Sequence, residues 1–290
     1  MKINFKVYGL FALAVLIFGA TTLATASSSL AQSTLEKIQQ RGKLLAGVRF
    51  DYPPNGSVDG QGNNLGFGPD IARAFAERLG VEVEFVQTTS KNRIPMLLNG
   101  QIDADIGPTT PTKTRDEVVD FSYTYIVDQA VIMVREGESK DPKAYFNSDK
   151  VVGALQGSSF VGLWKDHSPE ANIKEYQEFP QLVVALAQGK VDVVPVTEGS
   201  VYDLIEKLGD GAKDLAVGDV FYQDTHAIGL RENDSDWRDW VNWALQRMWA
   251  DGSFQKIYKK HYKIDPPFQL GDAGRLQPGY EKVAKENDPW

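Results

Sequence analysis

Residues 81–106 read VEVEFVQTTSKNRIPMLLNGQIDADI, and this stretch decides the fold class. Apolar and acidic residues alternate over residues 81–85, as in a strand, whose successive side chains point to opposite faces. Residues 94–98 keep the apolar spacing of a helix, with a proline tolerated in its first turn and an Asn-Gly stop behind it. A second strand-like run follows at residues 102–106. Alternation of strands and helices predicts an α/β fold with a parallel sheet and right-handed crossovers.

The same alternation extends to both sides of this stretch. Residues 44–48 form a short apolar run that predicts a strand, and a helix with apolar spacing is expected from residue 69 to Gly80. The pattern restarts after residue 150, with a strand at residues 151–155 and a nearly continuous apolar run at residues 191–196. Such a run suits a buried parallel strand. Two strand–helix halves with different sequences therefore predict two lobes.

We expect lobe 1 to comprise residues 34–126 and 227–290, and lobe 2 to comprise residues 127–226. Two strands should cross between them and act as a hinge. A chain of this length is sufficient for two separate hydrophobic cores.

The first 31 residues have the features of an export signal. Lys2 and Lys6 give a positive start, residues 10–20 are almost wholly apolar, and small residues precede a cleavage site near Ala31. The apolar run is short for a membrane span, which disfavours the alternative of a membrane-anchoring helix. The chain contains no cysteine, which excludes disulfides and an anchor attached to an N-terminal cysteine. We expect an exported, periplasmic protein.

The chain is acidic, with a formal net charge of −8 over 290 residues. Removal of residues 1–31 takes away two lysines and no acid, so the net charge of the remaining 259 residues becomes −10. An acidic protein is a poor ligand for nucleic acids and for anionic membranes. An anion bound by this protein must therefore be held by a local cluster of positive charge.

The sequence offers little machinery for catalysis. The three histidines are far apart and have no metal-ligand spacing, and no serine lies in a nucleophile elbow. Residues 60–66 resemble a dinucleotide fingerprint with one residue too many, which we interpret as a turn. Asp103 and Asp105 could be read as a carboxylate pair, but we interpret both as structural residues. We expect a protein that is not an enzyme and that carries no cofactor or metal.

Three arginines each follow a strand-like run: Arg49, Arg93 and Arg115. Ligands of open α/β sheets gather at the carboxyl ends of the strands, and arginine offers planar, bidentate donors to carboxylates. Thr109 and Thr110 follow the same strand as Arg115. For any one arginine, exposure to solvent or pairing with a neighbouring acid is the more common situation. Their shared edge of the sheet nevertheless favours an anion site.

The second half of the chain contributes a helix start to this edge. Gly157, Ser158 and Ser159 follow a predicted strand and open a helix, whose free backbone N–H groups favour an anion. An ordinary helix cap is the alternative for these residues taken alone.

Five motifs resemble the family 3 extracellular solute-binding proteins, which serve ABC importers of polar amino acids. They are residues 66–72 (GFGPDIA), 100–103 (GQID), 110–115 (TPTKTR), 119–125 (VDFSYTY) and 250–258 (ADGSFQKIY). The resemblance covers nearly the whole chain after the signal. It implies a two-lobed periplasmic-binding-protein fold of type II, in which each lobe is a mixed sheet flanked by helices and two strands form the hinge. It also implies an ABC permease in the inner membrane as partner of a monomeric protein.

Residues 89–95 and 107–110 resemble most closely the glutamate/aspartate-binding subgroup of that family. The resemblance implies that the ligand is an acidic amino acid whose α-carboxylate is held by Arg115 and Thr110. It also implies that the side-chain carboxylate is held by Arg49, Arg93 and Ser90, and that Ser158 or Ser159 closes from the second lobe.

One position departs from the family pattern. The family usually places an aspartate, which binds the ligand ammonium, at the end of the strand equivalent to residues 191–196. Thr197 stands there in this chain, followed by Glu198. Three alternatives follow. Glu198 turns inward to bind the ammonium, the ammonium is held weakly, or the ligand has no amine, as in a dicarboxylate.

The resulting hypothesis is a periplasmic binding component that closes around glutamate or aspartate by hinge motion. A broader binder of polar amino acids or dicarboxylates is an alternative. A second alternative is an enzyme, since the fold resembles that of cyclohexadienyl dehydratases and Glu198 could then act as an acid. A third is a sensor domain that signals to a membrane kinase.

Overall fold

The computed structural model describes residues 32–147 and 149–270. The described residues from Thr34 onward belong to one compact unit. The helices and strands in chain order are α2 (Thr34–Arg41), β1 (Lys43–Arg49), β2 (Asp51–Tyr52), β3 (Gly56–Val58), β4 (Asn64–Leu65), α3 (Phe67–Leu79), β5 (Glu82–Thr88), α4 (Arg93–Leu98), β6 (Ala104–Asp105), α5 (Lys113–Asp116), β7 (Val119–Arg135), η1 (Pro142–Ala144), β8 (Val151–Leu155), α6 (Ser159–His167), β9 (Asn172–Tyr176), α7 (Phe179–Ala187), β10 (Val194–Thr197), α8 (Glu198–Leu208), η2 (Gly209–Gly211), β11 (Leu215–Arg231), α9 (Ser235–Ala250) and α10 (Ser253–Tyr262).

The main sheet has six strands in the order β10-β7-β11-β6-β1-β5. Strand β1 pairs in parallel with β5 and β6, as the strand–helix alternation predicts. Strand β11 pairs antiparallel with β6 and β7, and β7 pairs antiparallel with β10. Strands β8 and β9 form a separate parallel pair. The sheet is therefore mixed, and the parallel prediction holds for its β5-β1-β6 part.

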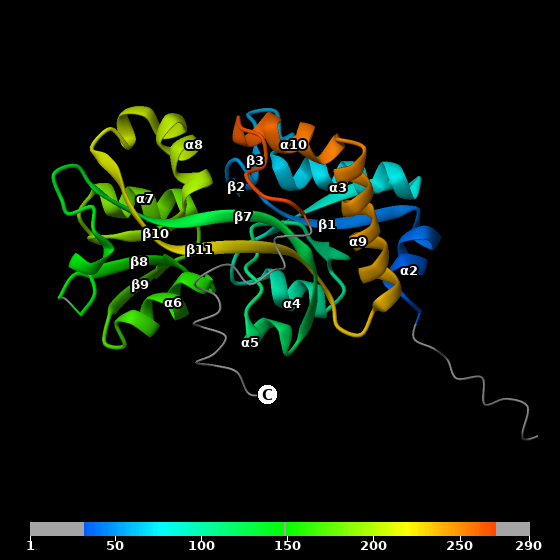
Figure 1. The fold of residues 1–290 in the computed structure, drawn as a ribbon, viewed down its shortest axis with the longest axis horizontal. Helices are drawn as coiled ribbons and strands as arrows, with labels where there is room; N and C mark the ends of the chain where they lie inside the picture. The colour runs from blue at the N-terminus through cyan, green and yellow to red at the C-terminus, as the bar shows by residue number, and fades with distance from the viewer. Residues whose placement is uncertain (1–31, 148, 271–290) are drawn as a thin grey trace, which may run out of the picture. The chain divides into compact units, whose positions relative to one another are not determined.

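Strands β7 and β11 are the longest elements, with 17 residues each, and they pair side by side over most of their length. Figure 1 shows α2, α3, α9 and α10 around one end of this pair and α6, α7 and α8 around the other. The predicted lobe boundaries fall within the paired stretch, where Ile126 lies opposite His226 and Val127 opposite Thr225. The boundaries themselves stay a prediction.

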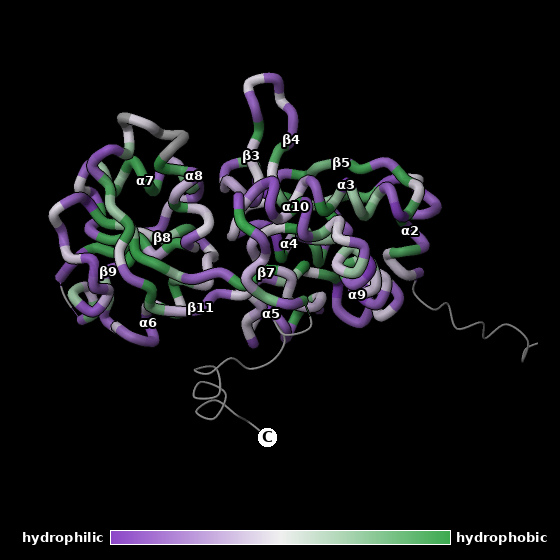
Figure 2. Tube along the Cα trace, turned by 45° about the horizontal axis from the view of Figure 1, so that its top comes forward, coloured by the Kyte–Doolittle hydropathy of each residue, from purple (hydrophilic) through white to green (hydrophobic). Residues whose placement is uncertain are grey.

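The apolar residues gather in separate clusters at the two ends of β7 and β11. The first core packs the inner faces of α3, α9 and α10 on β1, and includes Phe67, Phe75 and Trp237, each fully buried. The second core packs α7 on β8 and β10 and includes Phe179 and Leu186. In Figure 2 the hydrophobic segments follow the strands and the inner helices, whereas the tip of the β3–β4 hairpin is hydrophilic. Burial of apolar area in each core stabilises it by about 25 cal/mol per Å².

Most local predictions from the sequence are confirmed. The strand expected at residues 81–85 is β5, the helix expected at 94–98 is α4, and residues 60–62 lie in the turn of the β3–β4 hairpin. The strand expected at residues 102–106 is shorter, because β6 spans only Ala104–Asp105. Backbone N–H groups of Asp103 and Ile106 still donate to β1, and the chain then turns away at Gly107-Pro108. Proline lacks the N–H that a longer ladder would need.

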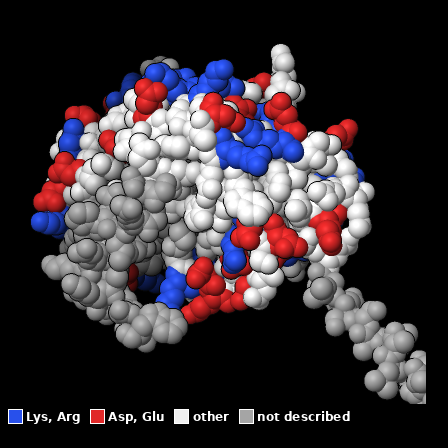
Figure 3. Space-filling model, turned by 45° about the vertical axis from the view of Figure 1, so that its right-hand side comes forward, with Lys and Arg blue, Asp and Glu red and all other residues white. Residues whose placement is uncertain are grey.

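The predicted signal peptide lies outside the described residues. No helix in the described part of the chain is long and apolar enough to cross a membrane. On the face drawn in Figure 3, Lys and Arg side chains are interspersed with Asp and Glu.

Candidate ligand-binding site

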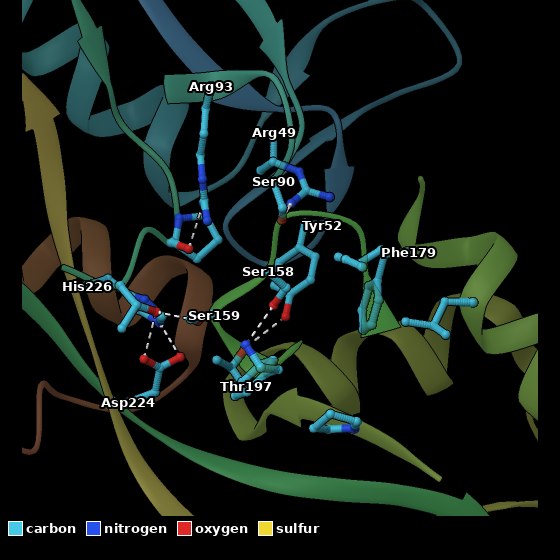
Figure 4. A pocket seen from close by; sticks show the side chains of 16 residues that line it. Arg49, Tyr52, Ser90, Arg93, Ser158, Ser159, Phe179, Thr197, Asp224 and His226 are labelled. Atoms are coloured by element: carbon cyan, nitrogen blue, oxygen red, sulfur yellow. Dashed lines mark hydrogen bonds and ion pairs between the residues drawn. The ribbon is translucent and has the colours of Figure 1, made fainter. Parts of the chain in front are cut away.

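A small cavity lies where residues of the first core's strands face residues of the second core (Figure 4). Its walls are formed by Arg49, Tyr52, Ser90, Arg93, Pro108, Thr110, Leu155, Ser158, Ser159, Phe160, Phe179, Leu182, Pro195, Thr197, Asp224 and His226. A larger, more open cavity continues from it and shares Thr110, Ser158, Ser159, Phe160 and Asp224.

The strand ends bring the polar side chains together. Arg49 is the last residue of β1, Thr110 follows β6, and Thr197 is the last residue of β10. Arg93 opens α4 behind β5. The carboxyl ends of strands thus supply the cavity, which is where an open α/β sheet places ligands. The sequence-based expectation that these residues share one edge agrees with this geometry.

Arg49 lies in the wall of the cavity, but its guanidinium is paired within the protein. Its Nε and Nη2 donate to the two carboxylate oxygens of Asp51 at 2.9 and 3.0 Å, and its Nη1 donates to Ser90 Oγ at 3.2 Å. The guanidinium also lies 5.0 Å from the ring centre of Tyr52. The Asp51 carboxylate accepts a further hydrogen bond from the backbone N–H of Phe179, at the start of α7. Asp51 therefore neutralises Arg49 and ties it to the second core.

Arg93 is buried, with 3 % of its surface exposed. Its Nη1 donates to Thr109 Oγ at 2.7 Å and to the Pro108 carbonyl at 3.0 Å, and Thr109 in turn donates to Asp105. Among the described residues, Arg93 Nε has no hydrogen-bond partner. Burial lowers the pKa of Arg93, and the nearby Arg115 acts in the same direction. Thr109 thus supports Arg93 and does not line the cavity.

Arg115 lies in the wall of the larger cavity, next to the smaller one. Its Nη1 donates to the carbonyl of Thr110, and its Nη2 donates to the carbonyl of Gly157 at 2.9 Å. Burial lowers its pKa, while Asp105 and Asp224 raise it. The guanidinium is directed to these carbonyls and to the cavity, and not to the adjacent acids that sequence reasoning offered as alternative partners.

The start of α6 faces the arginines across the cavity. Ser158 caps the helix by accepting from the N–H of Phe160, and Ser159 Oγ lies 3.1 Å from Thr110 Oγ. Gly157 adopts φ +77, and a Cβ there would lie 2.8 Å from the carbonyl oxygen of Ser90. Glycine is therefore required for this close approach of the two halves.

Thr197 lines the cavity, whereas Glu198 is half-buried as the first residue of α8 and does not. The hydroxyl of Thr197 lies 3.0 Å from Tyr52 Oη and donates to Ser200 Oγ. The hydrogen-bonding capacity of the Thr197 hydroxyl is largely used within the protein, and this hydroxyl supplies no charge. Of the three answers left open for the ligand ammonium, an inward Glu198 finds no support in this geometry.

Sequence reasoning missed Asp224 and His226, which lie on β11 and line the cavity. Asp224 Oδ1 accepts from Thr110 Oγ at 2.9 Å, and Asp224 Oδ2 lies 3.9 Å from His226 Nε2. Burial raises the pKa of Asp224 to about 6 and lowers the pKa of His226 to about 4. The available signal was an acid and a histidine two residues apart, which lie on one face of a strand.

Metal binding finds no support in the geometry of the described residues. No three His, Cys, Asp or Glu side chains among residues 32–147 and 149–270 are grouped so as to hold an ion.

Comparison with known proteins identifies the class. Residues 44–264 match the model of the bacterial extracellular solute-binding proteins, family 3. The match covers most of the chain, so the protein belongs to this family.

Named relatives extend over most of the sequence. The ABC transporter glutamine-binding protein GlnH of Bacillus subtilis is 29 % identical over 251 residues, which are 83 % of this chain and 89 % of that protein. The glutamate-binding protein GluB of Corynebacterium efficiens is 24 % identical over 275 residues, 91 % of this chain and 93 % of that protein. These relatives are named as binding proteins and not as enzymes.

Comparison with solved structures identifies the fold. The P235GK mutant of ArgBP from T. maritima superposes with a TM-score of 0.73 at 28 % identity, covering 80 % of this chain and all of that chain. The ancestral amino acid-binding protein AncCDT-1, described as a precursor of cyclohexadienyl dehydratase, has a TM-score of 0.69 at 30 % identity, over 79 % of this chain and all of that chain. The fold is thus that of the type II periplasmic binding proteins, as expected from the sequence.

Proposed function

We propose that this protein is the periplasmic amino-acid-binding component of an ABC importer. The observation that carries the proposal is the cavity whose wall combines arginines, a helix start and one buried carboxylate. Two kinds of charge side by side suit a zwitterion better than a simple anion. The names of the relatives, which bind glutamine and glutamate, agree with this ligand class.

The α-carboxylate is assigned to Arg115, Thr110 and the start of α6. Thr110 and Ser159 have hydroxyls 3.1 Å apart, and the guanidinium of Arg115 is held against the Thr110 carbonyl. A carboxylate placed there would receive charge-assisted hydrogen bonds from Arg115 and Ser159, each worth about 1.5–3 kcal/mol, and one from Thr110 once its proton turns from Asp224 to the ligand. Ser158 caps α6, and the positive end of this helix's dipole favours an anion at the same point.

The ligand side chain is assigned to the region of Arg49, Ser90 and Arg93. Buried guanidiniums favour a second carboxylate, so an acidic amino acid is our first candidate. Arg93 Nε is without a hydrogen-bond partner among the described residues, so this N–H group can donate to the side-chain carboxylate of the ligand.

A neutral polar amino acid such as glutamine is the second candidate, because of one specific contact. Asp51 already binds Arg49 with both carboxylate oxygens, so the pair has no net charge to offer. An uncharged amide would then be accepted without disruption of the pair.

Binding is proposed to close two lobes, residues 34–126 with 227–290 and residues 127–226, about the paired strands β7 and β11. The closed form would be recognised by an ABC permease in the inner membrane. The separate hydrophobic clusters at the two ends of these strands support rigid lobes. We propose a monomer that binds without turnover, exported by cleavage near Ala31.

A thermal-shift panel on ligand-stripped protein tests this function. A ligand that binds the folded state raises the melting temperature by mass action, so the shifts rank the ligands. We expect L-glutamate, L-aspartate or L-glutamine to give the largest shift and succinate a smaller one. No shift with any amino acid would contradict the proposal.

The Arg49→Ala variant tests the side-chain assignment. We expect it to lower affinity for glutamate and aspartate more than it lowers the melting temperature, because the guanidinium lines the cavity. Arg73→Ala is the control, since Arg73 pairs with Asp70 on the exposed face of α3. Unchanged affinity for both acidic amino acids in calorimetry would refute the assignment.

A further inference from the structure

We propose that Asp224 holds the ammonium group of the ligand, in place of the residue at the end of β10. This inference rests on the proposed function, because it names the group that recognises the amine of an amino acid.

The lining of the cavity offers one carboxylate. Among the described residues that line it, Asp224 is the only acid. Asp51 is close, but both of its oxygens are bound by Arg49 and one also accepts from the backbone of Phe179. Thr197 carries no charge, and Glu198 does not reach the wall. An ammonium in this cavity therefore has Asp224 as its counter-charge.

The place of Asp224 fits the covalent geometry of an α-amino acid. Its Oδ1 lies 2.9 Å from the hydroxyl of Thr110, which is assigned to the α-carboxylate. In an α-amino acid, the carboxylate and the ammonium are attached to the same carbon. Their two receptors must consequently be neighbours, as Thr110 and Asp224 are (Figure 4 shows Asp224 beside Ser159 and His226).

Asp224 can accept a cation because the protein only partly compensates the negative charge of its carboxylate. The carboxylate is buried, and burial raises its pKa to about 6. The positive charges of Arg93 and Arg115 act against this rise in pKa. Asp128 on β7 is a second acid that interacts with the Asp224 carboxylate. His226 stays neutral, and neither of its ring nitrogens has a hydrogen-bond partner within the described residues. A ligand ammonium would supply the missing positive charge, and would lower the pKa of this carboxyl.

The test compares two probes that differ only in the amine, L-glutamate and glutarate, with L-glutamine as a third. Titration calorimetry is run on ligand-stripped wild type, on Asp224→Asn and on the control Asp103→Asn. Asp103 is also a buried aspartate with a raised pKa, but its partners are Arg41 and Leu45, away from the cavity. Melting temperatures check that each variant is folded.

We expect Asp224→Asn to weaken the amino acid that binds wild type by about 10- to 150-fold, the loss of one charge-assisted hydrogen bond. The affinity for glutarate should stay the same or increase, since a negative charge has been removed. Asp103→Asn should leave the ligand order unchanged. Equal losses for amino acid and glutarate, or an amino-acid affinity within twofold of wild type, would overturn the inference.

A second readout is the proton balance of binding. At pH 6 the wild type should release on the order of half a proton when an amino acid binds, because the carboxyl of Asp224 is about half protonated there. Calorimetry in two buffers of different ionisation enthalpy measures this release. It should vanish in Asp224→Asn, and its persistence would count against Asp224. If wild type binds no amino acid at all, the proposed function fails, and this inference fails with it.

Discussion

The two sides of the cavity treat their charges differently. On the arginine side, Arg49 is bound by Asp51 and Ser90, so the protein satisfies the guanidinium itself. On the aspartate side, Asp224 is buried against a hydroxyl and a neutral histidine. The comparison teaches that one side of the site can exchange an internal counter-charge for a ligand group, whereas the carboxylate on the other side is hydrogen-bonded by Thr110 but is ion-paired with no arginine or lysine within the described residues. We therefore expect the aspartate side, with Arg115 and Thr110, to set affinity and the arginine side to set selectivity.

Removal of Arg115 should have the largest effect. Arg115→Met deletes up to two charge-assisted hydrogen bonds to the α-carboxylate, so we expect affinity for every amino acid to fall by about 10²- to 10⁴-fold in calorimetry. Arg135→Met is a matched control, because Arg135 also donates to two backbone carbonyls, those of Leu186 and Val191, away from the cavity. A loss below threefold would break the assignment of affinity to the aspartate side.

The pH dependence of stability should differ between wild type and Asp224→Asn. The folded-state pKa of Asp224 is raised, from 3.8 to about 6, so the folded state holds its proton more tightly than the unfolded state does. Stability from this group is present below pH 3.8 and is lost as pH rises to about 6. Asp224→Asn does not lose this stability. Its free energy of unfolding, relative to that of wild type, should therefore increase by up to about 3 kcal/mol between pH 3.8 and about 6.

Denaturant titrations of both proteins between pH 4 and pH 7 measure this difference. The lowered pKa of His226 changes stability in the opposite direction, since the unfolded state then binds the extra proton, but it is common to both proteins and cancels in the difference. A difference that stays constant with pH would show that Asp224 is not a buried acid of this kind.

Release of Arg49 from its internal partner should sharpen selectivity. Asp51→Asn keeps an oxygen for the N–H of Phe179 but removes the counter-charge of Arg49. We expect the ratio of glutamate to glutamine affinity to rise about tenfold, because a buried guanidinium gains most from an ionised partner. Asp192→Asn removes the corresponding acid from Arg135 and should leave the ratio unchanged. A ratio that falls in Asp51→Asn would contradict the account of the arginine side.

The smallest effect is expected from Tyr52→Phe. The hydroxyl of Tyr52 lies 3.0 Å from Thr197 Oγ and joins the two halves of the cavity wall. Its loss should lower the free energy of unfolding by about 1 kcal/mol, the net worth of one hydrogen bond. Ligand order should not change, since this contact carries no charge; a changed order would mean that Tyr52 selects the ligand directly.

The sequence predicted the elements well where the pattern is local. Alternation over residues 81–85 and helical spacing over residues 94–98 gave β5 and α4, because both depend on the period of the side chains. The residue pattern did not predict the antiparallel course of β7 and β11, since pairing over 17 residues depends on contacts distant in sequence.

The candidate site was predicted in part. Arg49, Arg93, Thr110, Ser158 and Ser159 line the cavity, as expected from strand ends and helix starts. Ser90 and Thr197 line it as well, and these two were expected from the family resemblance. Asp224 and His226 lie within β11, so a search for residues at strand ends does not find them. The pairing of Arg49 with Asp51 could not be foreseen either, because two residues separated by one position in sequence can point together or apart, depending on how the strand bends between them.

A co-crystal structure of ligand-stripped protein with its tightest amino acid tests the central claim most directly. The account predicts an electron density in the cavity between the two cores, with the ligand ammonium within about 3.2 Å of a carboxylate oxygen of Asp224 and its α-carboxylate at Thr110 and Arg115. An amino acid bound elsewhere, or one whose ammonium contacts Thr197 or Glu198 with Asp224 turned away, would contradict it.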